Sequence, residues 1–241
     1  MTIIPVESAV STNSYLKELA HRQALEEGTV IVTGNQTEGR GQRGNAWESE
    51  AAKNITCSIL LYPSFLPVRR NFLLSEAISL GVKETLDAYI DGIVIKWPND
   101  IYYQEKKIAG ILIENELMGN EFCLSVVGIG LNVNQERFLS DAPNPVSLKQ
   151  ITGKDWDTET LLRELVRNIL HRYGQLKAGD TETLIPMYHD ALYRKTGIHR
   201  YEDSEGIFHA RLDRVSDDGF LHLVTDRNEA RSYAFKSVRF L

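Results

Sequence analysis

Residues 92–134 read GIVIKWPNDIYYQEKKIAGILIENELMGNEFCLSVVGIGLNVN, and this stretch decides the fold. Apolar runs rich in β-branched and aromatic residues lie at 92–97, 102–103, 107–117 and 122–133. Turn signals separate these runs, namely Pro98, the QEK segment at 104–106, and Gly119 with Asn120. Because strands joined by short turns pair with one another, the stretch predicts the hairpin-rich middle of a β-sheet.

Helices and further strands flank this middle. Capping side chains at Ser11–Asn13 precede an apolar spacing that predicts an amphipathic helix closed by Gly28. Further strands are predicted at 29–33 and 54–62, and further helices at 72–89, 158–177 and 182–193. A helix, then hairpins, then more helices indicate an α+β fold, with a mixed sheet and helices packed on one face of it.

The pattern changes after Arg194. Short alternating segments follow, split by turns that contain Asp, Gly or Asn, at 198–201, 207–212, 220–224 and 231–240. They predict a small β-barrel, so we expect two domains, 1–193 and 194–241. Because so small a barrel buries little apolar surface alone, we expect it to pack on the larger domain.

The composition is that of an ordinary soluble globular protein, with 42% hydrophobic and 25% charged residues. The net charge of −6 argues against broad nucleic-acid binding, although it leaves room for a local positive pocket around a phosphate-bearing ligand. The N-terminus lacks the pattern of a signal peptide, and no apolar run approaches the length of a membrane span. We expect a cytoplasmic protein without a membrane or nucleic-acid partner.

Two cysteines, Cys57 and Cys123, lie in apolar stretches that are predicted as strands. They have neither CxxC spacing nor nearby histidines, which argues against a metal site. We expect both to be buried, inert thiols in a reducing compartment.

The polar, glycine-rich stretch 34–53 is a candidate for chemistry, because structureless segments of this length tend to be functional. GRGQRG at 39–44 satisfies the letters of the dinucleotide motif G-x-G-x-x-G, but the residues after it do not open a helix, and no Walker A lysine occurs. Glycines that admit an anion and arginines that pair with it instead indicate a loop that closes over a phosphate or carboxylate. A solvated surface loop is the simpler alternative, which Trp47 disfavours because an aromatic side chain needs something to cover.

Three further segments carry candidate residues, each with a purely structural alternative. KWPND at 96–100 ends a strand with a turn, and by itself it is most simply structural. Lys107 begins a buried-looking strand in which Gly110 leaves room for a ligand, although a lysine at a strand end can also extend to solvent. Glycines in the run 128–134 indicate either a bulge or the close approach of a ligand.

Taken together, these segments resemble the biotin protein ligase family. The matching segments, in the family's order and spacing, are STN (11–13), Gln36 with GRGQRGNAW (39–47), KWPND (96–100), KIAGILIE (107–114) and GIGLNVN (128–134). The resemblance covers the whole chain and implies a class II synthetase-like catalytic fold followed by an SH3-like barrel. It also implies a biotin–[acetyl-CoA-carboxylase] ligase reaction: biotin reacts with ATP and Mg²⁺ to give biotinyl-5′-AMP and pyrophosphate. Biotin then passes to a lysine of the biotin carboxyl carrier protein.

The resemblance implies a role for individual residues. The biotin-binding set is Ser11, Thr12, Asn13, Gln36, Arg40, Gly41, Gln42, Lys107, Gly110, Gly128 and Gly130. The nucleotide-binding set is Arg43, Trp47, Lys96, Asn99, Asn132 and Arg239. Lys107, Arg40 and Arg43 are the catalytic candidates, with Lys107 between the carboxylate of biotin and the α-phosphate. Magnesium arrives with ATP, and no protein ligand is assigned to it.

The chain departs from the family pattern at two loop positions, where Gln42 and Asn45 replace basic residues of many members. Arg40 and Arg43 must then supply more of the charge, and we expect the adenylate to be held more loosely. Larger relatives carry an N-terminal helix-turn-helix that represses biotin genes. The residues before Ser11 are too few to form one, so we expect an enzyme without repressor activity.

Three other functions remain open. A lipoate–protein ligase uses the same reaction type on a related fold, but the GRGQRG loop and KWPND favour biotin. A non-catalytic biotin- or nucleotide-binding regulator is disfavoured by Lys107 and the arginine loop. An α/β protein with an SH3-like appendage and no such site would leave the ordered motifs as coincidence. A homodimer is also possible, since exposed strand edges can pair two chains.

Overall fold

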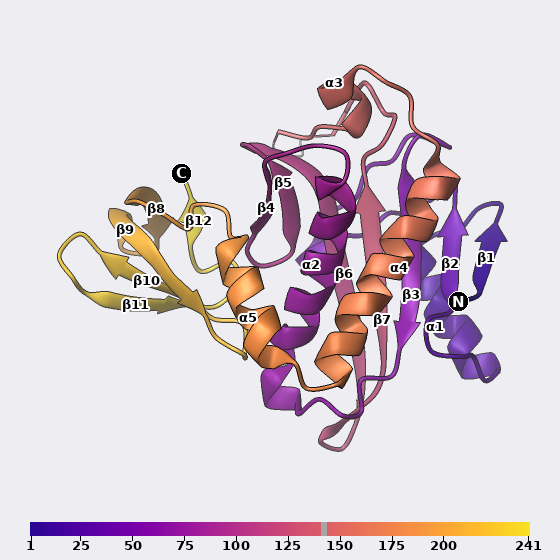
Figure 1. The fold of residues 1–241 in the computed structure, drawn as a ribbon, viewed down its shortest axis with the longest axis horizontal. Coiled ribbons are helices and arrows are strands. Elements are labelled where there is room, and N and C mark those ends of the chain that lie inside the picture. The colour runs from indigo at the N-terminus through magenta and orange to yellow at the C-terminus, as the bar shows by residue number, and fades with distance from the viewer. Residues whose placement is uncertain (141–143) are drawn as a thin grey trace.

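The computed structural model describes residues 1–140 and 144–241, except for the side chain of Arg43. Its centre is a seven-stranded sheet of order β1-β2-β3-β7-β6-β5-β4 (Figure 1). The strands are β1 (Ile3–Val6), β2 (Val30–Thr33), β3 (Ile55–Leu61), β4 (Ile93–Lys96), β5 (Asp100–Tyr103), β6 (Lys106–Met118) and β7 (Glu121–Leu131). β1 pairs parallel with β2 and the other neighbours pair antiparallel, which confirms the predicted mixed sheet.

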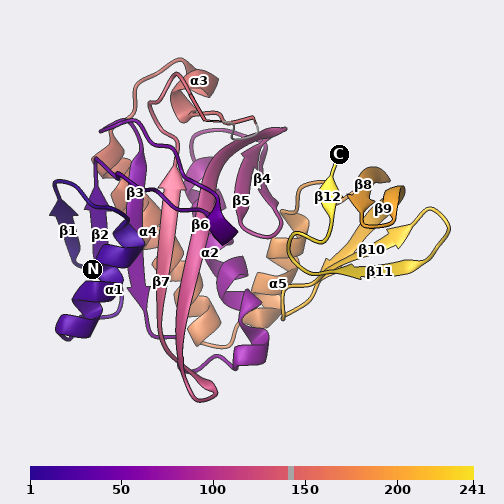
Figure 2. The ribbon, with the colours of Figure 1, turned by 180° about the vertical axis from the view of Figure 1, so that it is seen from behind.

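Helices cover both faces of this sheet, so the expectation of helices on one face only is wrong. The helices are α1 (Thr12–Arg22), α2 (Phe72–Asp87), α3 (Leu148–Thr152), α4 (Thr158–Lys177) and α5 (Thr181–Asp190), with short 3₁₀ turns at Gln42–Gly44 and Val68–Arg70. α2 and α4 pack against the face seen in Figure 1, over the large core. α1 lies on the opposite face, as Figure 2 shows. Its Leu16 forms a small second core with Ile31, Leu60 and Val126, because β2, β3 and β7 are apolar on both faces.

The α1 face of β7 determines where a site can form. Leu124, Val126, Gly128 and Gly130 alternate onto this face, so the first two pack under α1 and the last two present no side chain. The paired strands continue the pattern, since Gly130 lies opposite Gly110 on β6 and Thr56 on β3. The sheet therefore carries apolar side chains beneath α1. Beyond the N-terminus of that helix it presents glycine backbone without side chains, and this region is called the bare part of the sheet below.

Several element ends differ from their predicted positions. The helix 158–177 is confirmed as predicted, but α1 ends at Arg22 rather than near Gly28, because Gln23 is already extended. Ser11 is the N-cap residue of α1, yet its side chain makes no capping hydrogen bond.

Burial raises the pKa of the Cys57 thiol to about 12, whereas Cys123 is exposed, so the prediction of two buried thiols is wrong for Cys123.

The C-terminal segment forms a second, five-stranded antiparallel sheet of order β11-β10-β9-β8-β12, which confirms the predicted small β unit. Its strands are β8 (His199–Asp203), β9 (Gly206–Val215), β10 (Leu221–Thr225), β11 (Ala230–Tyr233) and β12 (Arg239–Phe240). The indole of Trp97 donates to the carbonyl of Gly219 at 3.0 Å, and Arg70 pairs with Asp217 at 2.6 Å. The unit thus packs on the first sheet, while the domain boundary after residue 193 stays a prediction.

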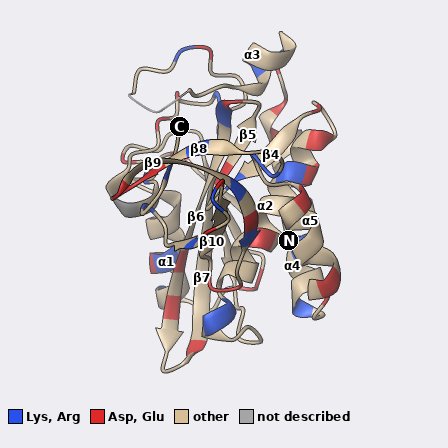
Figure 3. Cartoon of the chain, turned by 90° about the vertical axis from the view of Figure 1, so that its left-hand side faces the viewer, with Lys and Arg blue, Asp and Glu red and all other residues tan. Residues whose placement is uncertain are grey.

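Basic and acidic residues, blue and red in Figure 3, occupy interspersed positions along α4, α5 and the C-terminal strands. Some of them pair across helices, as Arg172 of α4 does with Glu84 of α2 at 2.9 Å. Among the described helices, none is long and apolar enough to cross a membrane.

Candidate active site

A cavity of about 500 Å³ opens over the bare part of the sheet. Most of the predicted site residues line it, namely Ser11, Thr12, Asn13, Gln36, Arg40, Gly41, Gln42, Trp47, Lys96, Asn99, Lys107, Gly110, Gly128, Gly130 and Arg239. The walls come from the start of α1, the 34–53 loop, the strands β4 to β7, and the last residues of the chain. Segments far apart in sequence therefore meet at one place, as their resemblance to a single site implied.

The glycines of the sheet make the floor of this cavity. A Cβ atom on Gly130 would overlap the indole of Trp47, and one on Gly128 would overlap the side-chain amide of Asn13. A Cβ on Gly110 would lie 3.1 Å from the same indole. The floor positions thus need glycine because other side chains lie directly over the backbone.

A polar pocket lies at the N-terminal end of α1. The backbone N–H of Thr12 donates to Oε1 of Gln36 at 2.9 Å. Ser58 Oγ, on β3, lies 2.7 Å from Thr12 Oγ1 and 2.6 Å from Asn13 Oδ1. Thr12, Asn13 and Ser58 are all buried, so this end offers fixed donors and acceptors away from bulk water.

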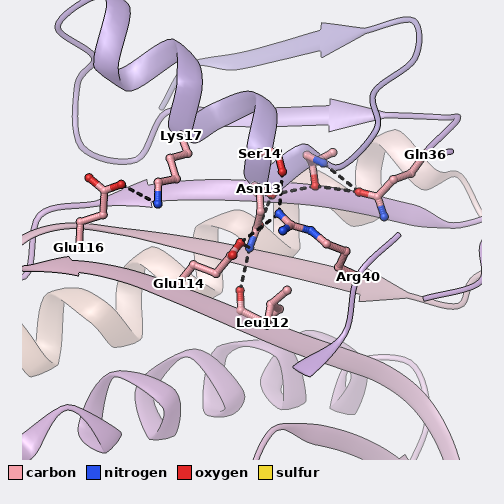
Figure 4. A network of polar contacts seen from close by, with 10 residues as sticks. Asn13, Ser14, Lys17, Gln36, Arg40, Leu112, Glu114 and Glu116 are labelled. Atoms are coloured by element: carbon pink, nitrogen blue, oxygen red, sulfur yellow. Dashed lines mark hydrogen bonds and ion pairs between the residues drawn. The ribbon is translucent and has the colours of Figure 1, made fainter. Parts of the chain in front are cut away.

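Two carboxylates of β6 face α1 beside this pocket, as Figure 4 shows. Glu114 accepts from Asn13 Nδ2 at 2.7 Å and lies 3.6 Å from the guanidinium of Arg40. Arg40 also donates to the hydroxyl of Ser14 at 2.6 Å. Glu116, further from the cavity, pairs with Lys17 of α1 at 2.6 Å. The loop and the helix are therefore both attached to β6.

Lys107 lies over the sheet with a single charged partner in the described chain, Asp100, at 2.7 Å. Its ammonium is also 5.6 Å from the centre of the Trp47 ring. The turn that carries Asp100 is held by Asn99, whose side-chain amide donates to the Ile111 carbonyl at 2.7 Å. KWPND thus places a carboxylate next to the candidate lysine.

Lys96 has an aromatic environment. Its ammonium donates to Tyr102 at 3.1 Å and lies 5.4 Å from the centre of the Phe240 ring. Burial lowers the pKa of Lys96, an effect that the nearby carboxylate of Asp100 opposes. Arg239 lines the same end of the cavity and pairs with Glu202.

The loop also contacts the segment that follows β7. The carboxylate of Glu48 accepts the backbone N–H groups of Leu139 at 2.9 Å and Ser140 at 2.7 Å. Burial alone would raise the pKa of Glu48, but these hydrogen bonds outweigh it and hold the pKa below its usual value. The loop is thereby joined to the segment after β7 as well as to α1 and β6.

Two predicted residues are not placed in the cavity. The side chain of Arg43 lies outside the described residues, so its predicted role is untested. Asn132 is buried and donates to the Val146 carbonyl at 3.1 Å instead of lining the cavity. Its Oδ1 has no hydrogen-bond partner in the described part of the chain.

Sequence reasoning gave no binding role to several lining residues, some of which lie inside the quoted motifs, namely Asn45, Ala46, Thr56, Trp97, Pro98, Asp100, Ile111, Leu112, Ile129, Phe235, Lys236, Val238 and Phe240. For Asp100 a signal existed, because it closes the KWPND motif. For the residues after 234 none did, since their distance along the chain hides their contact with β4. Among the described residues, no three His, Cys, Asp or Glu side chains form a metal-binding group.

The sequence of this chain is similar to those of known proteins. Residues 6–132 match the family model of the Biotin/lipoate A/B protein ligase family. Over 234 residues the chain is 30% identical to the bifunctional ligase/repressor BirA of Bacillus subtilis, covering 93% of this chain and 70% of that protein. It is 32% identical over 169 residues to the biotin–[acetyl-CoA-carboxylase] ligase of Mycobacterium tuberculosis, covering 68% and 61%.

A solved structure agrees over the full length. The biotin protein ligase from Aquifex aeolicus in complex with biotin and ATP matches with a TM-score of 0.82 and 27% identity, covering 100% of this chain and 99% of that one. Because the match covers the whole chain, it includes both sheets. The chain belongs to the biotin/lipoate A/B protein ligase family.

Proposed function

We propose that this protein is an ATP-dependent biotin–protein ligase. It activates biotin as biotinyl-5′-AMP and transfers it to a lysine of the biotin carboxyl carrier protein of a biotin-dependent carboxylase. The observation that carries the proposal is that Lys107, the arginine loop and the polar end of α1 line one cavity. A cytoplasmic location, a homodimer and the lack of repressor activity stay predictions.

One end of the cavity matches the polar and apolar groups of biotin along the length of that molecule. The cyclic urea of biotin has two N–H donors and one carbonyl acceptor, which match the buried oxygens and N–H groups around Thr12, Gln36 and Ser58. The apolar sulfur ring and chain fit between the glycine floor and Trp47. The carboxylate then reaches Lys107.

The other end of the cavity suits a nucleotide. Lys96 and Arg239 line it together with aromatic side chains, which offers positive charge for phosphates and a surface for adenine. Asp100 and Asn99, which line the cavity, would offer oxygen donors for Mg²⁺ beside those of the phosphates. When bound, Mg²⁺ neutralises charge on the triphosphate.

Catalysis in this site is chiefly alignment and charge stabilisation. A carboxylate oxygen of biotin attacks the α-phosphorus, the bond from that phosphorus to the bridging oxygen breaks, and pyrophosphate leaves. The ammonium of Lys107, oriented by Asp100, stabilises the negative charge that both reactants bring to this point. In the second step the neutral amine of the carrier lysine attacks the acyl carbon, AMP leaves, and the amine proton passes to solvent.

Pyrophosphate release tests the proposal. The purified protein is incubated with Mg-ATP and either biotin or lipoate, followed by a purified biotin carboxyl carrier domain. We expect biotin-dependent release and a mass increase of the carrier by one biotinyl group. Release with lipoate but not biotin would assign the protein to the lipoate branch of the family, and binding without release would indicate a regulator.

A further inference from the structure

Glu114 occupies a junction between the helix, the loop and the sheet. It lies on β6 opposite Val126 of β7, on the face that carries α1. One of its oxygens, Oε2, contacts both Asn13 of α1 and Arg40 of the loop (Figure 4). A single atom thus links two walls of the biotin end of the cavity.

The contact with Asn13 fixes the orientation of an amide. Both Asn13 Nδ2 hydrogens are used, one by Glu114 at 2.7 Å and the other by the Leu112 carbonyl at 3.2 Å. Because an ionised carboxylate only accepts, Nδ2 must face β6, and Oδ1 must face Ser58. Asn13 therefore has no donor left for a ligand, and it acts by holding the first turn of α1, with Ser11 and Thr12, over the sheet.

The contact with Arg40 attaches the loop. The guanidinium bridges Ser14 at 2.6 Å and Glu114 at 3.6 Å, and so draws residue 40 across the start of α1. The backbone of Arg40 also bridges to Ala46, which carries this restraint to the middle of the loop. A loop held near its bound position loses less conformational entropy when a ligand binds.

We propose that Glu114 is a positioning residue for the biotin end of the site, which orients Asn13 and tethers Arg40 before substrate arrives. The inference rests on the proposed function for its substrate, whereas the tether itself does not depend on it. Glu114 acts through other residues and leaves the reacting atoms to Lys107, so its loss changes the affinity for biotin more than the rate of the chemical step.

The chain supplies a matched control two residues away. Glu116 lies on the same face of β6 and joins α1 in the same way, through Lys17 at 2.6 Å and His21 at 2.9 Å. Neither carboxylate lines the cavity, but among the described residues Glu116 pairs only with residues of α1, whereas Glu114 also pairs with Arg40 of the loop. Glu116→Gln therefore removes a helix-to-strand attachment of the same type without touching the biotin end.

Tryptic cleavage after Arg40 and Arg43 of the ligand-free protein tests the tether. We expect Glu114→Gln to be cleaved about twofold to fivefold faster than wild type, since an exposed ion pair is a weak restraint. Glu114→Ala should be cleaved at least as fast, and Glu116→Gln at the wild-type rate. Melting temperatures measured in parallel show whether each variant is folded.

Biotin-dependent pyrophosphate release tests the consequence. In Glu114→Gln we expect the KM for biotin to rise about tenfold, with kcat and the KM for ATP changing less than about twofold. Unchanged cleavage and an unchanged KM for biotin in a folded Glu114→Gln protein would overturn the inference, and so would an equal effect of Glu116→Gln. If wild type released no pyrophosphate, the proposed function would fail, while the cleavage rates would still decide whether Glu114 holds the loop.

Discussion

Lys107 has a defined position because the backbone on both sides of it is fixed. Its N–H donates to the Asn144 carbonyl, its carbonyl accepts from Val146, and its ammonium pairs with Asp100. The side chain is half-buried and thus only partly screened by water. These restraints favour a charge held ready for substrate rather than one that moves freely in solvent.

Replacing Lys107 with alanine therefore removes stabilisation of the transition state. We expect kcat/KM for pyrophosphate release to fall at least about 100-fold, as for other preorganised charges, with little change in the melting temperature. Lys106→Ala is the control, since Lys106 is the exposed neighbour at the start of the same strand. Full activity of Lys107→Ala would remove this residue from the mechanism.

Gln42 lines the cavity, and the family resemblance of the sequence implies a basic residue at this position. A neutral side chain offers phosphate no charge, so we expect biotinyl-5′-AMP to dissociate more slowly from Gln42→Arg than from wild type. A rapid-filtration assay with radiolabelled biotinyl-5′-AMP measures the dissociation rate from each protein. Equal release rates in the two proteins would show that position 42 does not set retention.

At the scale of elements, periodicity predicted the strands and helices with the strongest patterns. The run 92–134 became β4 to β7, because its turns are short and its strands are apolar. β1 was missed since Pro5 weakens a short run, although proline is tolerated on an edge strand such as this one. The prediction that all helices lie on one face of the sheet was also wrong for α1. Periodicity shows that a helix has an apolar face, but not which surface that face contacts.

The glycine positions on the cavity face of β7 lead to a prediction at the scale of this strand. Gly130→Ala places a methyl group where the Trp47 indole lies, so the indole and the loop that carries it must move away from the floor. We expect the KM for biotin to rise at least about tenfold, and the Trp fluorescence to shift to the red as the indole meets water. Gly174→Ala in α4 is the control, because a Cβ atom there meets no atom within 4 Å. A Gly130→Ala protein with wild-type fluorescence and KM would contradict the assigned floor.

At the scale of the molecule, the first sheet and the C-terminal unit meet around a buried carboxyl group. Glu76 of α2 is 1% exposed, and its Oε2 has no hydrogen-bond partner among the described residues. Burial raises the pKa of Glu76 to about 8, the charge of Asp217 adds to this, and Arg70 opposes it. The native protein therefore holds a proton here at pH values where the unfolded chain has lost it.

This pKa sets the sign of a pH dependence. Because the folded pKa is about 8 and the ordinary pKa of a glutamate is 4.5, the stabilising contribution of protonated Glu76 is complete below pH 4.5 and is lost as pH rises toward 8. We expect the free energy of unfolding to fall by up to about 1.4 kcal/mol per pH unit in that window, and Glu76→Gln to flatten the fall. Urea unfolding at pH 5, 7 and 9 measures it, with exposed Glu121→Gln as control. The same slope in Glu76→Gln and wild type would contradict this assignment.

The candidate site was predictable to the extent that its motifs lie close together in the sequence. KWPND, KIAGILIE and the glycine-rich loop are short and dense in special residues, so their positions in the cavity followed from their order. Phe235 and Phe240 were not foreseen as lining residues, because a residue outside any motif becomes part of a wall only through long-range packing. Asn13 was foreseen as a ligand-binding residue, which stays a prediction; both of its N–H donors are used within the protein, so only its Oδ1 can accept from a ligand, and no spacing reveals this.

The wall residues of the cavity run from Ser11 to Phe240, almost the full length of the chain. During synthesis on a ribosome the complete cavity therefore cannot exist until the final strand has emerged from the exit tunnel. Ligands that need both ends of the cavity can stabilise, by mass action, only a chain in which this final strand has already folded into place. A stop codon a few positions before Phe235 would leave the large sheet its own core, yet deprive the nucleotide of one wall.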